Sequence, residues 1–188
     1  MEGEDTRLKC ENAQLDKPVT NYSWPDTVGG TPFGQFLIFD NVSKDLHLKR
    51  VRCAGSHGES SARLVYSDSI FLKIYYKPVI KIISSAPTCS PQTSLSNVCF
   101  ITRGHNVTLS CQAKSNPPPA SVKWFGKITS TTMNITITLA EQKTDGGAYI
   151  CSAETEKSSD DQRLPLFSSY QFTVIVQCNN EIHKLLIY

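Results

Sequence analysis

The chain has 188 residues, of which 39% are hydrophobic, and its 19 basic and 17 acidic residues give a net charge of +2. This hydrophobic content suffices for small packed cores and excludes a disordered chain. The nearly balanced charge predicts no strong attraction to nucleic acid or to anionic membranes. No apolar run approaches the roughly 20 residues of a membrane span. The length allows one large domain or two of about 100 residues each.

Seven cysteines are many for a cytosolic chain of this length, in which reduced thiols usually bind metal or take part in catalysis. No Cys-x-x-Cys pair occurs, and none of the four histidines stands at a metal-ligand spacing from a cysteine. The sequence therefore predicts disulfides, an extracellular location, and no metal or other cofactor. The segment from Met1 to Thr6 lacks the charged-then-apolar pattern of a signal peptide, so we expect the chain to be part of a longer protein.

One pattern of a cysteine, a tryptophan and a second cysteine occurs twice, 101, 100 and 98 residues apart. Its two copies are Cys10, Trp24 and Cys53, and Cys111, Trp124 and Cys151. Apolar and polar residues alternate near these landmarks, as from Val107 to Leu109 and from Ile135 to Leu139. No stretch of ten or more residues has a helical period. The sequence thus predicts an all-β chain that contains one module of about 100 residues twice.

The strongest motif lies in the second module, where Tyr149 stands two residues before Cys151 and the cysteines share the inward phase of their strands. A tyrosine at this place ties the turn between two sheets to the backbone, and an inward cysteine pair packs on a tryptophan. On these residues the chain resembles the immunoglobulin superfamily over nearly its whole length. The resemblance implies two tandem immunoglobulin-like β-sandwiches of the shorter C2 or I-set kind. It also implies the disulfides Cys10–Cys53 and Cys111–Cys151, with Trp24 and Trp124 packed on them.

The first module departs from this pattern, because Val51 replaces the tyrosine and His47 stands where an aspartate is usual. We therefore expect packing to hold this turn, and this domain to be the looser one. The run Asn41 to Asp45, followed by Val51 and Cys53, nevertheless resembles the adhesion-type domains of nectin-like and nephrin-like receptors. Only nine residues precede Cys10, so we expect the first strand of this domain to be missing.

The domain boundary is expected after Lys77, because hardly any linker separates the last strand pattern of the first module from the next apolar run. We place domain 1 at residues 1–77, domain 2 at 78–178 and a tail at 179–188. A turn-rich segment lies between Cys89 and Cys99, the only cysteines close in sequence, and a third disulfide is expected to close it. That segment is either a pinned insertion or a binding loop. The sequence assigns no partner to Cys178.

The sequence contains no catalytic motif, since a Gly-x-Ser-x-Gly elbow, a phosphate-binding glycine loop and a His-Glu-x-x-His run are all absent. We therefore expect no enzymatic activity. Asn-x-Ser/Thr sequons predict glycosylation at Asn21, Asn41, Asn106 and Asn134. Strand phase directs three of these side chains outward and the fourth lies at a turn. Glycans there would cover strand faces and leave edges and loops to partners.

Two functions fit these features. The favoured one is an extracellular protein-binding module of a cell-surface adhesion or recognition receptor, which binds protein partners. The alternative is a secreted, soluble immune or matrix recognition protein, with glycans among its ligands. The basic run Lys44–Arg52 suits a sulfated polysaccharide, although a solvated strand face is the plainer interpretation. Protein is expected to bind at strand edges and loops, above all at the polar stretch Glu154–Leu166, for which disorder is the competing interpretation.

Overall fold

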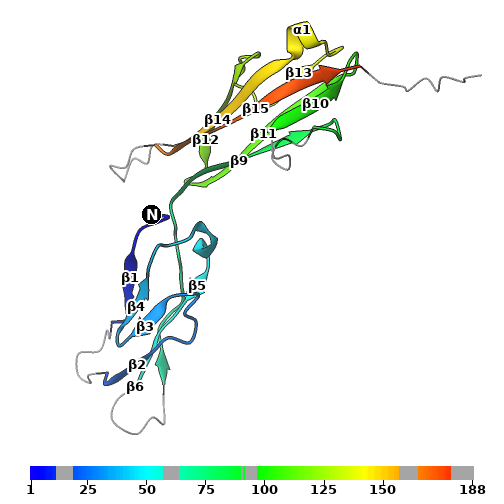
Figure 1. The fold of residues 1–188 in the computed structure, drawn as a ribbon. Coiled ribbons are helices and arrows are strands. Elements are labelled where there is room, and N and C mark those ends of the chain that lie inside the picture. The colour runs from blue at the N-terminus through cyan, green and yellow to red at the C-terminus, as the bar shows by residue number, and fades with distance from the viewer. Residues whose placement is uncertain (12–18, 57–63, 90, 92–96, 157–164, 179–188) are drawn as a thin grey trace, which may run out of the picture. The chain divides into compact units, whose positions relative to one another are not determined.

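The computed structural model describes residues 1–11, 19–56, 64–89, 91, 97–156 and 165–178. They form a chain of β-strands that divides into two compact units, Met1–Tyr76 and Lys77–Tyr188 (Figure 1). Helical turns in this described part are limited to the 3-10 helix η1 (Lys44–Leu46) and helix α1 (Gln142–Asp145). The predicted all-β fold class is confirmed. The tail expected at 179–188 lies outside the described residues.

Unit 1 is built from short strands in small antiparallel sheets. Two sheets have the orders β1-β4-β3 and β2-β6-β7, and strands β5 and β8 pair with each other. The strands are β1 (Thr6–Lys9), β2 (Asn21–Ser23), β3 (Thr31–Phe33), β4 (Phe36–Phe39), β5 (Arg50–Val51), β6 (Ala54–Ser56), β7 (Val65–Tyr66) and β8 (Ile70–Phe71). The disulfide Cys10–Cys53 joins the residue after β1 to the residue before β6, and so links the two larger sheets.

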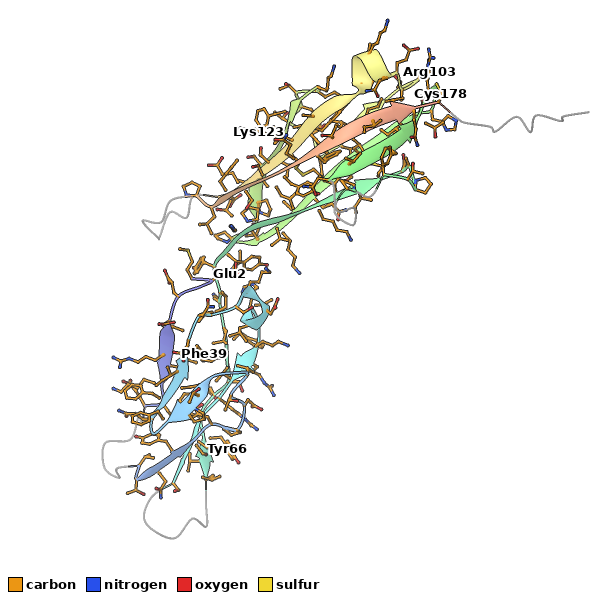
Figure 2. All side chains as sticks on the ribbon, in the orientation of Figure 1. Glu2, Phe39, Tyr66, Arg103, Lys123 and Cys178 are labelled. Atoms are coloured by element: carbon orange, nitrogen blue, oxygen red, sulfur yellow. A yellow bond between two sulfur atoms is a disulfide. The ribbon has the colours of Figure 1, made fainter. Side chains whose placement is uncertain are left out.

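The core of unit 1 is small. Strand β4 alternates between buried and half-buried residues, which places Leu37 and Phe39 inside; Phe39 is labelled in Figure 2. The other members of the core cluster are Val42, Val51, Leu72 and Ile74. Trp24 is half-buried and packs against the margin of this cluster.

Unit 2 has longer strands in two sheets, with the orders β10-β15-β14-β12 and β13-β11-β9. The strands are β9 (Tyr76–Ser84, which starts at the last residue of unit 1), β10 (Val98–Thr102), β11 (Val107–Asn116), β12 (Pro119–Gly126), β13 (Asn134–Ile137), β14 (Gly147–Thr155) and β15 (Phe167–Gln177). The pairs β11–β13, β12–β14 and β14–β15 are antiparallel, whereas β10 runs parallel to β15. The two sheets meet over one continuous apolar core.

The centre of this core is a disulfide packed with aromatic rings. Cys111 on β11 is bonded to Cys151 on β14, which joins the two sheets. Trp124 is fully buried in the same cluster, and its ring meets the edge of Phe172 at a centroid distance of 6.4 Å. Phe172 also stacks on Tyr149, with the centroids 5.9 Å apart. Sulfur and three rings therefore fill the space between the sheets.

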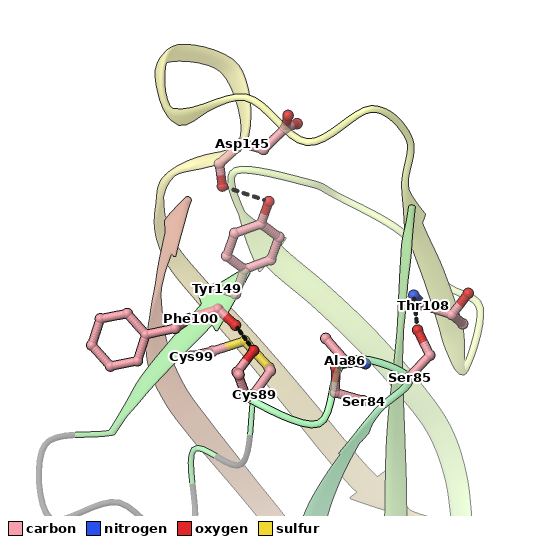
Figure 3. The surroundings of a disulfide bond; sticks show 10 residues. Ser84, Ser85, Ala86, Cys89, Cys99, Phe100, Thr108, Asp145 and Tyr149 are labelled. Carbon is pink, nitrogen blue, oxygen red and sulfur yellow. Dashed lines mark hydrogen bonds between the residues drawn. A yellow bond between two sulfur atoms is a disulfide. The ribbon is translucent and has the colours of Figure 1, made fainter. Parts of the chain in front are cut away.

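Tyr149 also closes the turn that precedes β14. Its hydroxyl donates a hydrogen bond of 2.9 Å to the main-chain oxygen of Asp145, the interaction expected from the sequence (Figure 3). Burial raises the pKa of Tyr149 to about 12, and the negative charge of Asp145 acts in the same direction. The neutral phenol, which can donate, is therefore the stable form.

Unit 1 holds the corresponding turn with a histidine as well as with packing. Val51 is completely buried, as the sequence leads one to expect. In addition, Nδ1 of His47 accepts a hydrogen bond of 3.2 Å from the N–H of Ile74, and the imidazole meets the Tyr76 ring edge-on at 5.8 Å. The expectation that packing alone holds this turn is therefore incomplete, because the imidazole supplies both an acceptor and an aromatic contact.

A Tyr149→Phe substitution tests the tyrosine hydrogen bond, because it removes the hydroxyl and keeps the stacked ring. At neutral pH we expect the free energy of unfolding of unit 2 to fall by about 1 kcal/mol, the usual net value of one such bond. Tyr170→Phe is the control, since the Tyr170 hydroxyl donates at an exposed site to Oδ1 of Asn97. Chemical denaturation should show a smaller loss for that variant.

Tyr149→Phe should also change how the free energy of unfolding depends on pH in alkaline solution. The unfolded phenol has a pKa of about 10, whereas the folded one titrates near 12. The stabilisation from this group is therefore complete below about pH 10 and is lost as the pH rises toward 12. Tyr149→Phe should remove this part of the decline when unfolding is compared across that range. An equal decline in both proteins would contradict the assignment.

Candidate functional site

The stretch Glu154–Leu166, expected to be the main binding loop, is described only at its base. Residues 157–164 lie outside the described residues. At the base, the N–H of Thr155 donates to the oxygen of Leu166, and the N–H of Leu166 donates to Oγ1 of Thr155, both at 2.9 Å. Thr155 is buried, so the two strands are joined firmly where the stretch begins and ends. A binding role for the stretch itself stays a prediction.

The third disulfide joins Cys89 to Cys99, the pair expected from the sequence (Figure 3). Strands β9 and β10 belong to different sheets, so this bond closes the segment in which the chain crosses between them. Both cysteines are buried in the core of unit 2. The hydroxyl of Thr88 also donates to the oxygen of Phe100 at 2.8 Å. These contacts favour a pinned insertion; most of the segment between the cysteines lies outside the described residues.

Two of the four Lys and Arg side chains in the basic run Lys44–Arg52 lie beside carboxylates. Nζ of Lys44 lies 3.6 Å from a carboxylate oxygen of Glu2, and Nε of Arg52 lies 3.4 Å from Oδ2 of Asp26. Two cations of the run are thus paired with carboxylates of unit 1. This arrangement is typical of a solvated, charge-balanced surface and does not favour binding of a sulfated polysaccharide.

A cluster of exposed apolar side chains distinguishes unit 1. Val65, Tyr66, Ile70 and Phe71, on the short strands β7 and β8, are each between 50% and 61% exposed. We call these four residues the Tyr66 patch; Tyr66 is labelled in Figure 2. Single exposed apolar residues are ordinary, whereas four in one short stretch of sequence make this stretch a candidate contact surface.

Ile70 is exposed, although Leu72 and Ile74, which follow it at alternate positions, are buried. Its partner in the ladder, Val51, is completely buried, whereas Ile70 itself is half exposed. The reason is that β8 is a two-residue strand at the edge of its sheet, so the core closes over Val51 and leaves the outer residue uncovered.

The charged side chain of Arg52 contacts Tyr66, the aromatic member of the Tyr66 patch. The guanidinium of Arg52 lies over the Tyr66 ring, 4.9 Å from its centroid, which is a cation–π contact. The carboxylate of Asp26 lies on the same guanidinium as an ion pair, although Nε of Arg52 makes no hydrogen bond of good geometry. Tyrosine and arginine are the residue types that most often dominate the energy of protein–protein interfaces. The patch therefore offers an aromatic anchor beside a fixed positive charge.

Other kinds of site are not seen in the described part of the chain. There, no group of three or more histidine, cysteine, aspartate or glutamate side chains is arranged to hold a metal ion. The described helices include none with the length and apolar character needed to span a bilayer.

Comparison with known proteins agrees with this architecture. Residues 86–174 match the immunoglobulin domain family, which covers most of unit 2. The mouse V-set and immunoglobulin domain-containing protein 10 is 26% identical in an alignment of 156 residues that covers 73% of this chain and 24% of that protein. The chain thus spans about a quarter of the length of that relative. Residues 86–174 of unit 2 are therefore similar to an immunoglobulin domain, and the inter-sheet disulfides and the tyrosine turn agree with that match.

Two solved structures have a similar arrangement of chain. The ectodomain of mouse nectin-like molecule 4 is 16% identical with a TM-score of 0.49, and the match covers 92% of this chain and 54% of that one. The amphioxus IgVJ-C2 molecule is 17% identical with a TM-score of 0.43, over 92% of this chain and 97% of that one.

The Tyr66 patch is the feature that the sequence analysis missed, although the sequence holds a signal for it. Residues Leu64 to Tyr66 and Ile70 to Leu72 are runs of three consecutive apolar residues. Because successive side chains of a strand point to opposite faces, such a run must direct at least one apolar side chain away from the core. In a small unit with two short edge strands, that side chain is left exposed.

Proposed function

We propose that the chain is an extracellular protein-binding module of a cell-surface adhesion or recognition receptor, and that the Tyr66 patch of unit 1 is its principal contact surface. The observation that carries this proposal is the exposure of four large apolar residues beside the Arg52–Tyr66 contact. The proposed site is a surface for another protein, in which Tyr66 is the aromatic anchor, the other patch residues are apolar, and Arg52 provides a positive charge.

The position of the patch supports a role in binding. Exposed apolar edge strands are sites of unwanted pairing, and proteins usually protect them with charged residues, proline or a covering segment. Strands β7 and β8 lie at the edges of two different sheets and carry exposed apolar residues; among the described strands, β7 pairs only with β6 and β8 only with β5. A partner that covers such residues would keep them from solvent.

The sequons are compatible with this surface, and we propose that all four carry glycans. Asn21, Asn41, Asn106 and Asn134 are exposed. Oδ1 of Asn106 accepts a hydrogen bond of 2.9 Å from the N–H of Leu139, and a glycan on the amide nitrogen would leave that bond intact. Asn21 lies on β2, at the opposite edge of the sheet from β7. Glycans would therefore leave the Tyr66 patch open.

The contact surface is tested by substituting Tyr66→Ser and Phe71→Ser together in the secreted chain and measuring binding to cells or the aggregation of coated beads. Interface residues of this kind often contribute 2 kcal/mol or more each, so we expect binding to weaken by about 30-fold or more. Phe167→Ser in unit 2 is the matched control, because Phe167 is 59% exposed and lies outside the patch. Loss of binding in the control alone would refute the proposed surface.

Glycosylation is tested on protein secreted from a glycosylating cell. We expect treatment with an endoglycosidase to lower its mass, and each Asn→Gln substitution at the four sequons to remove one glycan. The melting temperature should change little for Asn21 and Asn134, which are exposed, and more for Asn106→Gln, which also loses the hydrogen bond from Leu139. Peptide mass spectrometry that finds the asparagines unmodified would contradict this part of the proposal.

A further inference from the structure

The stretch of unit 1 that contains the Tyr66 patch carries much of the positive charge of the chain. Residues 49–73 include five basic and two acidic residues, a net charge of +3, whereas the whole chain has a net charge of +2. They are Lys49, Arg50, Arg52, Arg63 and Lys73, against Glu59 and Asp68. The rest of the chain is therefore slightly acidic. Charge gathered in one stretch attracts molecules of the opposite charge to that part of a protein.

One of these cations, Arg50, stands beside an aromatic member of the patch. Arg50 and Phe71 are directly opposite each other in the ladder of β5 and β8, so their side chains project from the same face. Both are exposed. The next pair of the ladder joins Ile70 to Val51, and Val51 is buried in the core. Arg50 and Phe71 therefore lie on the face that is turned to solvent.

The same face continues to the contact between Arg52 and Tyr66. Arg52 follows Arg50 by two residues, and Val51 between them is buried, as the alternation of an extended chain requires. Arg50 with Phe71, and Arg52 with Tyr66, are thus two successive pairs of an arginine and an exposed aromatic ring. Each ring of the Tyr66 patch has an arginine beside it.

The two arginines differ in how far their charge is neutralised within the chain. Oδ2 of Asp26 lies 3.4 Å from Nε of Arg52, and the guanidinium of Arg52 also lies over the Tyr66 ring. Arg50, in contrast, forms no ion pair with any carboxylate of the described residues. The charge of Arg50 is therefore available to another molecule.

Lys73 adds a second available cation near Phe71. Phe71 and Lys73 are exposed and Leu72 between them is buried, so the two exposed side chains point to the same side. Lys73 is likewise without an ion pair in the part of the chain that the structure describes, and Asp68, which is exposed between β7 and β8, is paired with neither Lys73 nor Arg50. An exposed aromatic ring thus lies beside two cations that no described carboxylate neutralises.

We propose that the partner of the Tyr66 patch is a protein with an acidic contact surface, which places a carboxylate side chain on Arg50 and an apolar side chain on Phe71. This inference rests on the proposed function, because it names the chemistry of the partner at the same surface. A carboxylate fits a guanidinium through two parallel hydrogen bonds, which gives direction as well as attraction. Arg52 has a different role, since it holds the Tyr66 ring and is already paired with Asp26.

The mixture of charge and apolar surface favours an acidic protein over a sulfated polysaccharide. Sequences that bind such polyanions are dense runs of lysine and arginine. Here Arg50 and Lys73 instead adjoin Phe71, which is 61% exposed, and Tyr66 beside Arg52 is 50% exposed. A protein interface combines these features, because it buries apolar and aromatic side chains at its centre and keeps charged groups around them.

The test measures binding of the full secreted chain to cultured cells that bind it, at several salt concentrations. Arg50→Glu should weaken binding at low salt by about tenfold or more, because repulsion replaces attraction, and Lys73→Glu should act in the same direction. Binding of the unsubstituted chain should weaken as NaCl rises from about 0.05 M to about 0.5 M, since salt screens exposed charges. Arg50→Glu should show a smaller dependence on salt.

Lys123→Glu in unit 2 is the matched control, because Lys123 is exposed and the substitution changes the net charge by the same amount (Figure 2). This variant should bind as the unsubstituted chain does at each salt concentration. Equal weakening by Lys123→Glu and Arg50→Glu would overturn the proposal, since the effect would then come from overall charge. The melting temperature of each variant shows whether it is folded, and the salt dependence of the unsubstituted chain requires no substitution.

The outcomes separate this proposal from the proposed function. If salt and Arg50→Glu leave binding unchanged while the Tyr66→Ser, Phe71→Ser variant loses it, the contact surface stands and the acidic partner is wrong. If the Tyr66→Ser, Phe71→Ser variant binds normally, the contact surface itself is wrong. Treatment of the cells with heparin lyase and sialidase should leave binding intact. Binding that this treatment abolishes and that protease treatment spares would overturn the proposal, because the ligand would then be an anionic glycan.

Discussion

The two-residue period of the strands, combined with the disulfide between facing sheets, is the constraint on which both units depend. A cysteine can reach its partner across the sandwich only if it occupies an inward position, and a slip of one residue would turn a whole strand's apolar set to solvent. The disulfides span 43 and 40 residues of chain. Closing loops of that size restricts the unfolded chain by about 4 kcal/mol in the entropy model, a large part of a domain's stability.

The two units use this constraint with different amounts of packing. In unit 2, long strands bring Trp124, Tyr149 and Phe172 around the disulfide, and an additional strand, β10, covers the edge of β15. In unit 1 the strands are shorter and the tryptophan is only half-buried. Val51 replaces the tyrosine of the turn, and His47 supplies a hydrogen-bond acceptor there. The same plan therefore leaves unit 1 with the smaller core and with exposed apolar side chains on β7 and β8.

The sequence predicts the features that follow from periodicity and from fixed landmarks. The all-β class follows from the alternation of apolar and polar residues. The tyrosine turn and the two inter-sheet disulfides are predicted from the resemblance to immunoglobulin domains, and the Cys89–Cys99 pair from its closeness in sequence. The features that could not be predicted depend on the length of edge strands and on contacts between residues distant in sequence. The exposure of Ile70 follows from a two-residue strand at an edge, and the bond from Ile74 to His47 joins residues 27 positions apart.

The account's central claim is that the Tyr66 patch of unit 1 makes the contact with the partner protein. It is tested most directly by placing a photo-cross-linking amino acid at Tyr66, and separately at Phe167 as an equally exposed site in unit 2, in the secreted chain bound to cells. The account predicts covalent capture of one surface protein from position 66 and none from position 167. Capture from position 167 with none from position 66 would contradict it.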